Sequence, residues 1–297
     1  EQLAPLTSDP CHAGVCQFRP EIVEVVYWKE LGVLAMDEAM MDINEWEPRT
    51  INHLISPHTQ TVRHALEAFW EVRREGRDHV GFGPTLLYGP AYLGRRLTAR
   101  IIAHELGLEV TEVLVSDSLW RSSEIAEVML DAQRSGTALV VLCELSSLPR
   151  GFESALYSAI RSGVLCSRSV TGRLEAHSFK IARCPIFVVC GQGNLCQRVI
   201  GQFRLILRFD PYPPDLLTQV VGQRAKALGW SLRDDAVALA VKDAKGRPGW
   251  ALQIIAASRM LAREAGKGPL APTHIRQGVA YLKHNWPPDK GQTKSGR

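Results

Sequence analysis

The pattern of hydrophobic and polar positions changes at Pro48 and again at the proline-rich segment 210–214. Between these points, stretches with apolar residues every three or four positions alternate with short, wholly apolar runs. Such alternation is typical of a parallel sheet covered by helices. The expected strands are Thr85–Tyr88, Leu108–Val115, Ala138–Cys143, Ile186–Val189 and Leu205–Phe209.

The helical spacing predicts helices between these strands and after the proline-rich segment. A mixed segment, Val164–Arg183, has Gly172 near its middle and favours an inserted β-hairpin. From Pro213 onward only helical spacing is found. The expected helices are Gln60–Gly76, Arg95–Gly107, Ser118–Ser135, Arg150–Gly163, Asp215–Leu228, Asp234–Lys242, Trp250–Ala265 and Thr273–Lys283.

The predicted fold class is therefore α/β, with a three-layer parallel-sheet domain at 48–212 and an all-helical domain at 213–284. The proline-rich segment between them is the expected hinge. Residues 1–47 form an N-terminal extension, in which a helix is predicted from Glu21 to about Trp46. The tail 285–297, rich in Pro, Lys and Gly, is expected to be disordered.

Composition adds little to this picture. Hydrophobic residues make up 45% of the chain, enough for a sizeable core, and 35 Lys and Arg against 31 Asp and Glu give a weakly basic protein. This charge permits contact with nucleic acid without predicting it. No apolar run approaches the roughly 20 residues of a membrane span, so no membrane association is expected.

The seven cysteines favour a cytoplasmic protein with reduced thiols, because their number is odd and Cys143 and Cys190 lie in apolar runs. A metal site is an alternative at 184–196, which holds three cysteines, or at Cys11 and Cys16, which flank His12. Zinc sites usually contain closer Cys pairs, so no metal site is predicted.

The most specific local signal follows the strand Thr85–Tyr88. The sequence Gly89-Pro90-Ala91-Tyr92-Leu93-Gly94-Arg95-Arg96 has the layout of a P-loop, G-x-x-x-x-G-K-[ST], with both glycines in place. Arg95 stands at the Lys position and Arg96 at the hydroxyl position that normally holds Mg²⁺. Arg95 can pair with a phosphate, but Arg96 would repel the metal ion. A strand-to-helix turn that binds no ligand is the alternative.

Several segments between residues 47 and 282 resemble the AAA+ family, and within it the RuvB motor core. They are Glu47–Ile51 with Leu54-Ile55, Leu86–Pro90, Ile101–Gly107, and Leu139–Glu144 with Leu156-Tyr157. The resemblance implies an AAA+ P-loop NTPase fold, ATP or ADP as ligand, a homo- or hetero-oligomeric ring and a link to DNA recombination and repair. The nucleotide contacts that it implies are Arg49, Ile55, Gly89, Pro90, Ala91, Tyr92, Leu93, Gly94, Arg95, Arg96, Leu97 and Trp250.

The resemblance also assigns catalytic positions, and several carry unexpected residues. The Walker B strand ends in Cys143-Glu144 instead of Asp-Glu, which implies that the water-activating Glu144 remains while the carboxylate that orients Mg²⁺ is lost. The first sensor corresponds to Gln192, with Asn194 as the alternative. Glu144 and Gln192 are the catalytic candidates.

Two arginines that the family uses are also replaced. Gln202 stands at the arginine-finger position, and Trp250 at the position of the second sensor arginine, where Arg247 is the alternative. An arginine finger alone contributes about 10³ to 10⁵ in rate. Its loss together with both Mg²⁺ contacts predicts a pseudo-ATPase that binds nucleotide weakly and binds Mg²⁺ poorly. The alternative is an empty pocket, in which Arg96 turns toward a carboxylate such as Glu144.

The leading hypothesis is a RuvB-like scaffold or regulatory subunit of a ring assembly linked to DNA processing. The alternatives are an ATP-dependent DNA translocase with a non-standard site that uses Arg95 and Glu144, and a clamp-loader-like subunit, against which Gln202 argues. The predicted hairpin lies where RuvB carries a hairpin that meets its junction-binding partner.

DNA contact is expected only at the level of the family. The winged-helix domain with which RuvB continues past its lid is not expected here, because the resemblance ends near Lys283. A basic strip could form near the hairpin, although a scattered set of charges like this one is more often a solvated surface. Its members are Arg161, Arg168, Arg173, Lys180 and Arg183.

Overall fold

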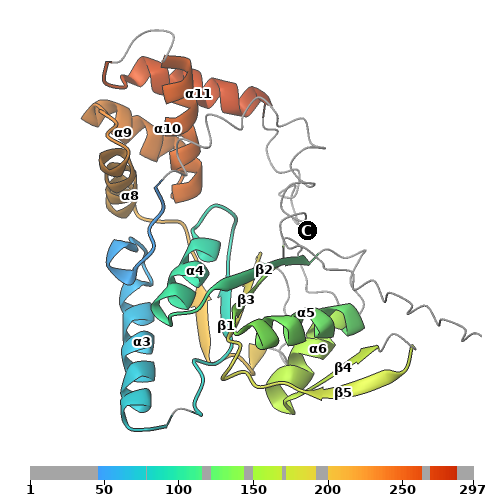
Figure 1. Ribbon diagram of the computed structural model, residues 1–297. Helices are drawn as coiled ribbons and strands as arrows, with labels where there is room; N and C mark the ends of the chain where they lie inside the picture. The colour runs from blue at the N-terminus through green and yellow to red at the C-terminus, as the bar shows by residue number, and fades with distance from the viewer. Residues whose placement is uncertain are drawn as a thin grey trace, which may run out of the picture.

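The computed structural model describes residues 46–77, 79–115, 122–143, 150–168, 172–191, 200–262 and 268–285. It contains a five-stranded parallel sheet with the strand order β2-β3-β6-β1-β7. Figure 1 labels its strands β1, β2 and β3. The order confirms the predicted parallel sheet and places β3 inside it. The strands are β1 (Thr85–Tyr88), β2 (Val110–Val115), β3 (Ala138–Cys143), β6 (Ile186–Cys190) and β7 (Leu205–Arg208).

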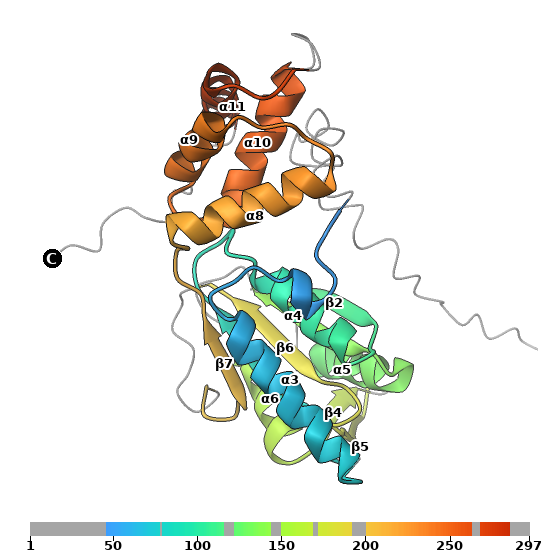
Figure 2. The same ribbon diagram turned by 90° about the vertical axis from the view of Figure 1, so that its left-hand side faces the viewer.

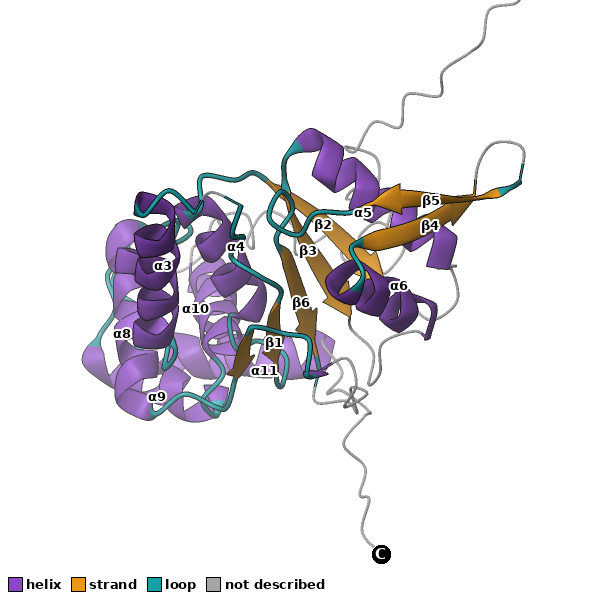
Figure 3. Cartoon of the chain, turned by 90° about the horizontal axis from the view of Figure 1, so that it is seen from below, coloured by secondary structure: helices purple, strands orange, loops and turns teal. Residues whose placement is uncertain are grey.

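Helices cover both faces of this sheet, which confirms the three-layer arrangement (Figures 2 and 3). In β3, Val140 packs into the cluster formed with α3 (Thr59–Arg74) and α4 (Arg95–Glu105). Its neighbours at 139 and 141 pack toward α5 (Ser122–Ser135) and α6 (Arg150–Arg161). Successive side chains of a strand point to opposite faces, so a strand covered on both sides must be apolar throughout.

The predicted hairpin is present as a separate two-stranded antiparallel sheet after α6. It consists of β4 (Val164–Arg168) and β5 (Leu174–Ser178), paired from Val164 with Ser178 to Arg168 with Leu174. Figure 3 shows it projecting beyond α5 and α6. Leu174 is 69% exposed at the outer end of β5.

In the described part of the chain, four helices follow the proline-rich segment, as predicted. They are α8 (Pro214–Ala227), α9 (Asp234–Ala244), α10 (Pro248–Ala262) and α11 (Pro272–Asn285). Helix α10 begins two residues before the predicted start, at Pro248, because proline is well suited to the first turn of a helix. One hydrophobic cluster runs from the α3 and α4 layer through Tyr212 and Leu217 into these helices. The exact domain limits stay a prediction.

The predicted helix between Glu21 and Trp46 and most of the tail 285–297 lie outside the described residues. In the described ranges, no helix combines the length and the apolar character that a bilayer crossing requires.

A matched pair of glycines tests the packing of the helices. Gly278 of α11 lies against α10, and a Cβ there would stand 2.3 Å from Ser258 Oγ and 3.0 Å from the carbonyl oxygen of Ile254. Gly278→Ala should therefore lower the free energy of unfolding by about 1–3 kcal/mol. Gly222→Ala in α8, where nothing lies within 4 Å, should raise it by about 0.5–1 kcal/mol. Chemical denaturation of both variants measures this, and equal effects would contradict close packing at Gly278.

Candidate functional site

The loop between β1 and α4 starts with a tight turn at the carboxyl edge of the sheet. Gly89 has a φ of +145°, and a Cβ there would lie 2.2 Å from the carbonyl oxygen of Phe209. Its N–H donates to the carbonyl oxygen of Cys190 (3.3 Å), and the N–H of Phe209 donates to Tyr88 (2.7 Å). Only glycine fits between the ends of β6 and β7, so the first glycine of the motif is required by the packing of neighbouring strands.

The second half of the loop is held by the helices that follow the sheet. Tyr92 has a φ of +67°, which is rare for a residue other than glycine, and its carbonyl accepts the N–H of Gly249 at 2.9 Å. Its ring meets that of Trp250 edge to face, with centroids 6.0 Å apart. Gly94, with a φ of +80°, precedes α4 as its N-cap and leaves the helix start without a side-chain cap.

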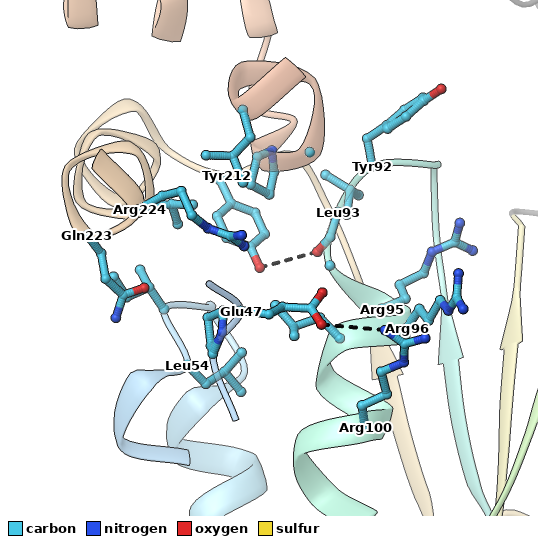
Figure 4. A pocket seen from close by; sticks show the side chains of 18 of the residues that line it. Glu47, Leu54, Tyr92, Leu93, Arg95, Arg96, Arg100, Tyr212, Gln223 and Arg224 are labelled. Carbon is cyan, nitrogen blue, oxygen red and sulfur yellow. Dashed lines mark hydrogen bonds and ion pairs between the residues drawn. The ribbon is translucent and has the colours of Figure 1, made fainter. Parts of the chain in front are cut away.

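A cavity of about 590 Å³ lies between this loop, the segment after Trp46, and helices α8 and α10 (Figure 4). Arg95, Arg96 and Arg100 of α4 stand on one side of it, opposite Gln223 and Arg224 of α8. The remaining lining residues are Glu47, Pro48, Leu54, Ile55, Tyr92, Leu93, Gly94, Leu97, Val189, Tyr212, Val220, Pro248, Gly249, Leu252 and Gln253. The cavity thus has a cationic side at the start of α4 and, elsewhere, an apolar wall interrupted by Glu47, Gln223, Arg224 and Gln253.

The structure brings most, but not all, of the predicted nucleotide contacts to this cavity. Those that line it are Ile55, Tyr92, Leu93, Gly94, Arg95, Arg96 and Leu97. Gly89, Pro90 and Ala91 form the turn behind it, and Arg49 lines an adjacent cavity of about 460 Å³. Trp250 lies next to Tyr92, while its neighbour Gly249 faces the cavity. The predicted catalytic residues, Glu144 and Gln192, lie outside the described residues.

Several lining residues were missed. Arg100 had a detectable signal, because it follows Arg96 by four positions and therefore shares its helix face. Tyr212, Gln223 and Gln253 had none, since they lie in or after the proline-rich segment and reach the cavity only through the tertiary fold.

Arg95, at the P-loop Lys position, is directed into the protein. Its Nη1 donates a hydrogen bond to the carbonyl oxygen of Cys190 at the end of β6. Burial lowers the pKa of Arg95, although the guanidinium remains charged at neutral pH.

Arg96, at the hydroxyl position, binds Glu112 of β2 together with Arg100. Arg96 donates to both carboxylate oxygens, with Nε 3.1 Å from Oε1, and Arg100 donates through Nε at 2.7 Å and Nη2 at 3.0 Å. Arg96 therefore turns toward a carboxylate, as expected, and the one observed is Glu112 of β2; Glu144, the expected example, lies outside the described residues. Burial disfavours the charged carboxylate, but the hydrogen bonds from Arg100 and Arg96 and their charges outweigh it, so the pKa of Glu112 is lowered.

Cys143, at the Walker B Asp position, is 3% exposed and lies beside Cys190 of the neighbouring strand. Burial, and then the proximity of Cys190, raises the pKa of the Cys143 thiol, so this position carries no negative charge at neutral pH. Mg²⁺ prefers oxygen ligands. In the described part of the chain, no group of three or more His, Cys, Asp or Glu side chains is placed to hold a metal ion.

The opposite side of the cavity contains a second buried arginine. Arg224 is 7% exposed, donates to the carbonyl oxygen of Trp46 and stacks on the Trp46 ring with its guanidinium 5.6 Å from the centroid. Burial lowers the pKa of Arg224, and the charge of Glu47 partly offsets this.

Nearby, the Tyr212 hydroxyl donates to the carbonyl oxygen of Leu93 at 3.3 Å, which ties the segment before α8 to the loop.

Comparison with known proteins shows what this chain resembles in sequence and fold. No family model matches the chain. The Holliday junction branch migration complex subunit RuvB of Kosmotoga olearia is 27% identical over 226 residues, 75% of this chain and 63% of its own length. The Holliday junction branch migration motor RuvB of Thermotoga maritima superposes with a TM-score of 0.62 at 21% identity, over 80% of this chain and 73% of that one. The chain is homologous to RuvB and has the AAA+ fold.

The fold is shared more widely at lower similarity. The Aeropyrum pernix ORC2 protein, solved in ADPNP and ADP complexes, superposes with a TM-score of 0.53 at 13% identity over 82% of this chain and 70% of that one. The chain spans about 63% of the length of its Kosmotoga relative. The cavity at the start of α4 therefore lies in a fold that the chain shares with these proteins.

The buried thiols give the first test of this site. The pKa is raised to about 11 for Cys190 and about 12 for Cys184, in both cases mainly by burial, and it is also raised for Cys143. Because the thiolate is the nucleophile, these three should resist iodoacetamide at mildly alkaline pH, whereas the exposed Cys166 reacts. Peptide mass spectrometry measures the labelling, and labelling in guanidinium chloride is the control. Labelling of Cys190 in the native protein as fast as that of Cys166 would contradict the burial.

Proposed function

We propose that this RuvB-like AAA+ protein does not hydrolyse ATP by itself and serves as a scaffold or regulatory subunit of a ring assembly linked to DNA processing. The observation that carries the proposal is the bonding of Arg96. Its guanidinium occupies the P-loop position that normally contributes a hydroxyl to Mg²⁺, and it is bound to Glu112. A cation at this position would meet Arg95, Arg96 and Arg100 within one turn or two of helix.

The proposed loss of hydrolysis follows from the absence of Mg²⁺ ligands at both expected positions. Phosphoryl transfer depends on the metal ion to neutralise the charge that develops on the phosphate oxygens. Arg96 repels a cation, and the buried thiol of Cys143 supplies no negative charge to attract one. Gln202, at the arginine-finger position, cannot supply the missing positive charge to a neighbouring site.

Nucleotide binding, in this proposal, is weak and independent of Mg²⁺. The apolar wall and the uncapped start of α4 suit a nucleotide, because backbone N–H groups at a helix N-terminus attract phosphate. However, the guanidinium groups of Arg95 and Arg96 take up room on the phosphate side of the cavity. Both are already hydrogen-bonded within the protein, Arg95 to Cys190 and Arg96 to Glu112. ATP or ADP therefore competes with internal partners.

The ring assembly and the link to DNA rest on the relatives. The names of the RuvB proteins state that they take part in Holliday junction branch migration, one as the subunit of a complex and one as a motor. Around the hairpin, Arg161, Arg173, Lys180 and Arg183 are exposed, which provides positive charge for nucleic acid or an acidic partner. A cytoplasmic location with reduced thiols is part of the same proposal.

The test is ATP turnover by the purified protein with Mg²⁺, which we expect to equal that of a buffer blank. The comparison is the combined variant Arg95→Lys, Arg96→Thr and Cys143→Asp, which restores both Mg²⁺ contacts. Calorimetry should show that Mg²⁺ raises the ATP affinity of this variant about tenfold or more and leaves that of the natural protein unchanged. Turnover by the natural protein that disappears on Glu144→Gln would refute the proposal.

A further inference from the structure

Helix α4 starts with an unusual accumulation of positive charge. The N-terminal end of a helix carries a partial positive charge, and acidic residues are favoured there. In α4 the first turn has no acidic residue and instead contains Arg95 and Arg96, with Arg100 one turn later. An anion from outside the helix is therefore needed to offset this charge, and in the structure it is Glu112 of β2.

Glu112 is held by more bonds than a surface ion pair normally has. Its two oxygens accept four hydrogen bonds, two from Arg96 and two from Arg100, which uses the full acceptor capacity of a carboxylate. The carboxylate is only 17% exposed, whereas the side chains of Arg96 and Arg100 are 43% and 35% exposed. Nη1 of Arg100 also lies 3.5 Å from Oε2 of Glu47. Paired bonds of this kind between guanidinium and carboxylate are among the stronger hydrogen bonds in proteins.

The two arginines and the carboxylate of this ion-pair cluster differ in their access to the cavity. Arg96 and Arg100 line the cavity, while Glu112 does not and approaches them from β2. A phosphate group that enters the cavity needs the same planar N–H edges that Glu112 occupies, since guanidinium groups bind phosphate and carboxylate with the same paired geometry. Carboxylate and phosphate are thus alternative partners of one pair of arginines.

We propose that Glu112 is an internal competitor that sets the affinity of this pocket for metal-free polyphosphate. In the free protein it occupies the two arginines and restrains them; a polyphosphate has to displace at least part of these bonds in order to bind. The inference rests on the proposed function only in taking the pocket to be a phosphate site. It assigns a role to Glu112 whether or not ATP is hydrolysed.

The test is calorimetric titration of the full chain with pyrophosphate and with tripolyphosphate, in the presence of EDTA. Glu112→Gln keeps the size of the side chain and removes its charge, so we expect both anions to bind about tenfold more tightly than to the natural protein. The matched control is Glu127→Gln, which makes the same change of net charge at an exposed position of α5 and should leave both affinities unchanged. An equal gain in both variants would overturn the proposal, because it would show only a general effect of charge.

A second pair of variants separates competition from a merely structural role. In the Arg96→Gln background, Glu112→Gln should raise the logarithm of the polyphosphate affinity by less than half as much as it does in the natural protein. The reason is that one of the two guanidinium groups that Glu112→Gln releases is missing. If Glu112→Gln fails to fold, Glu112→Asp takes its place, because the shorter side chain cannot keep both paired contacts; a gain of about threefold is then expected. Unchanged or weaker binding by the folded variant refutes the competition. Mg²⁺-dependent turnover by the natural protein would refute the proposed function and leave this comparison intact.

Discussion

The site depends on the close approach of two backbone segments, the turn at Gly89 and the end of β7. The carbonyl oxygen of Phe209 lies where the Cβ of any other residue would be, so the chain must leave β1 through a glycine. The hydrogen bond from the N–H of Gly89 to the carbonyl of Cys190 and the one from the N–H of Phe209 to the carbonyl of Tyr88 fix the turn between the neighbouring strands. The start of α4, the direction of its arginines and the floor of the cavity all follow from this turn, since they come next in the chain.

Above this turn, the charge of α4 is balanced inside the protein. Arg95 is bound by a backbone carbonyl, and Arg96 and Arg100 share Glu112. In a P-loop that hydrolyses nucleotide, the phosphates and the metal ion complete the charge balance. Here β2 provides an anion, Glu112, for two of the three arginines that lie within two turns of one helix. Because a phosphate has to compete with these internal bonds, they make its binding free energy less favourable.

The helices after the sheet are tied to the loop by direct contacts. Gly249 donates to the carbonyl of Tyr92, whose φ of +67° is stabilised by this bond, and Tyr212 donates to that of Leu93. A side chain at Gly249 would meet the backbone of Tyr92 at 3.2 Å. The absence of a side chain at Gly249 therefore permits α10 to rest on the loop. The position of the helices is therefore linked to the shape of the loop.

The sequence by itself determined the parts of this protein that depend on local periodicity. The apolar runs of β3 and β6, the hairpin around Gly172 and the helices after Pro213 were all predicted, because alternation and helical spacing are set by neighbours within a few residues. The P-loop frame was also visible, since its two glycines and its flanking strand and helix are contiguous in the chain.

Only the tertiary structure decided how the arginines are used. Glu112, which binds Arg96, is 16 positions away on the strand β2, and Cys190, which binds Arg95, is 95 positions away, so neither contact follows from spacing. The sequence suggested a carboxylate such as Glu144 because it stands at a family position, whereas Glu112 is brought within reach of Arg96 and Arg100 by the packing of β2 beside α4. Contacts between distant segments depend on how elements pack, and a one-dimensional pattern carries little of that information.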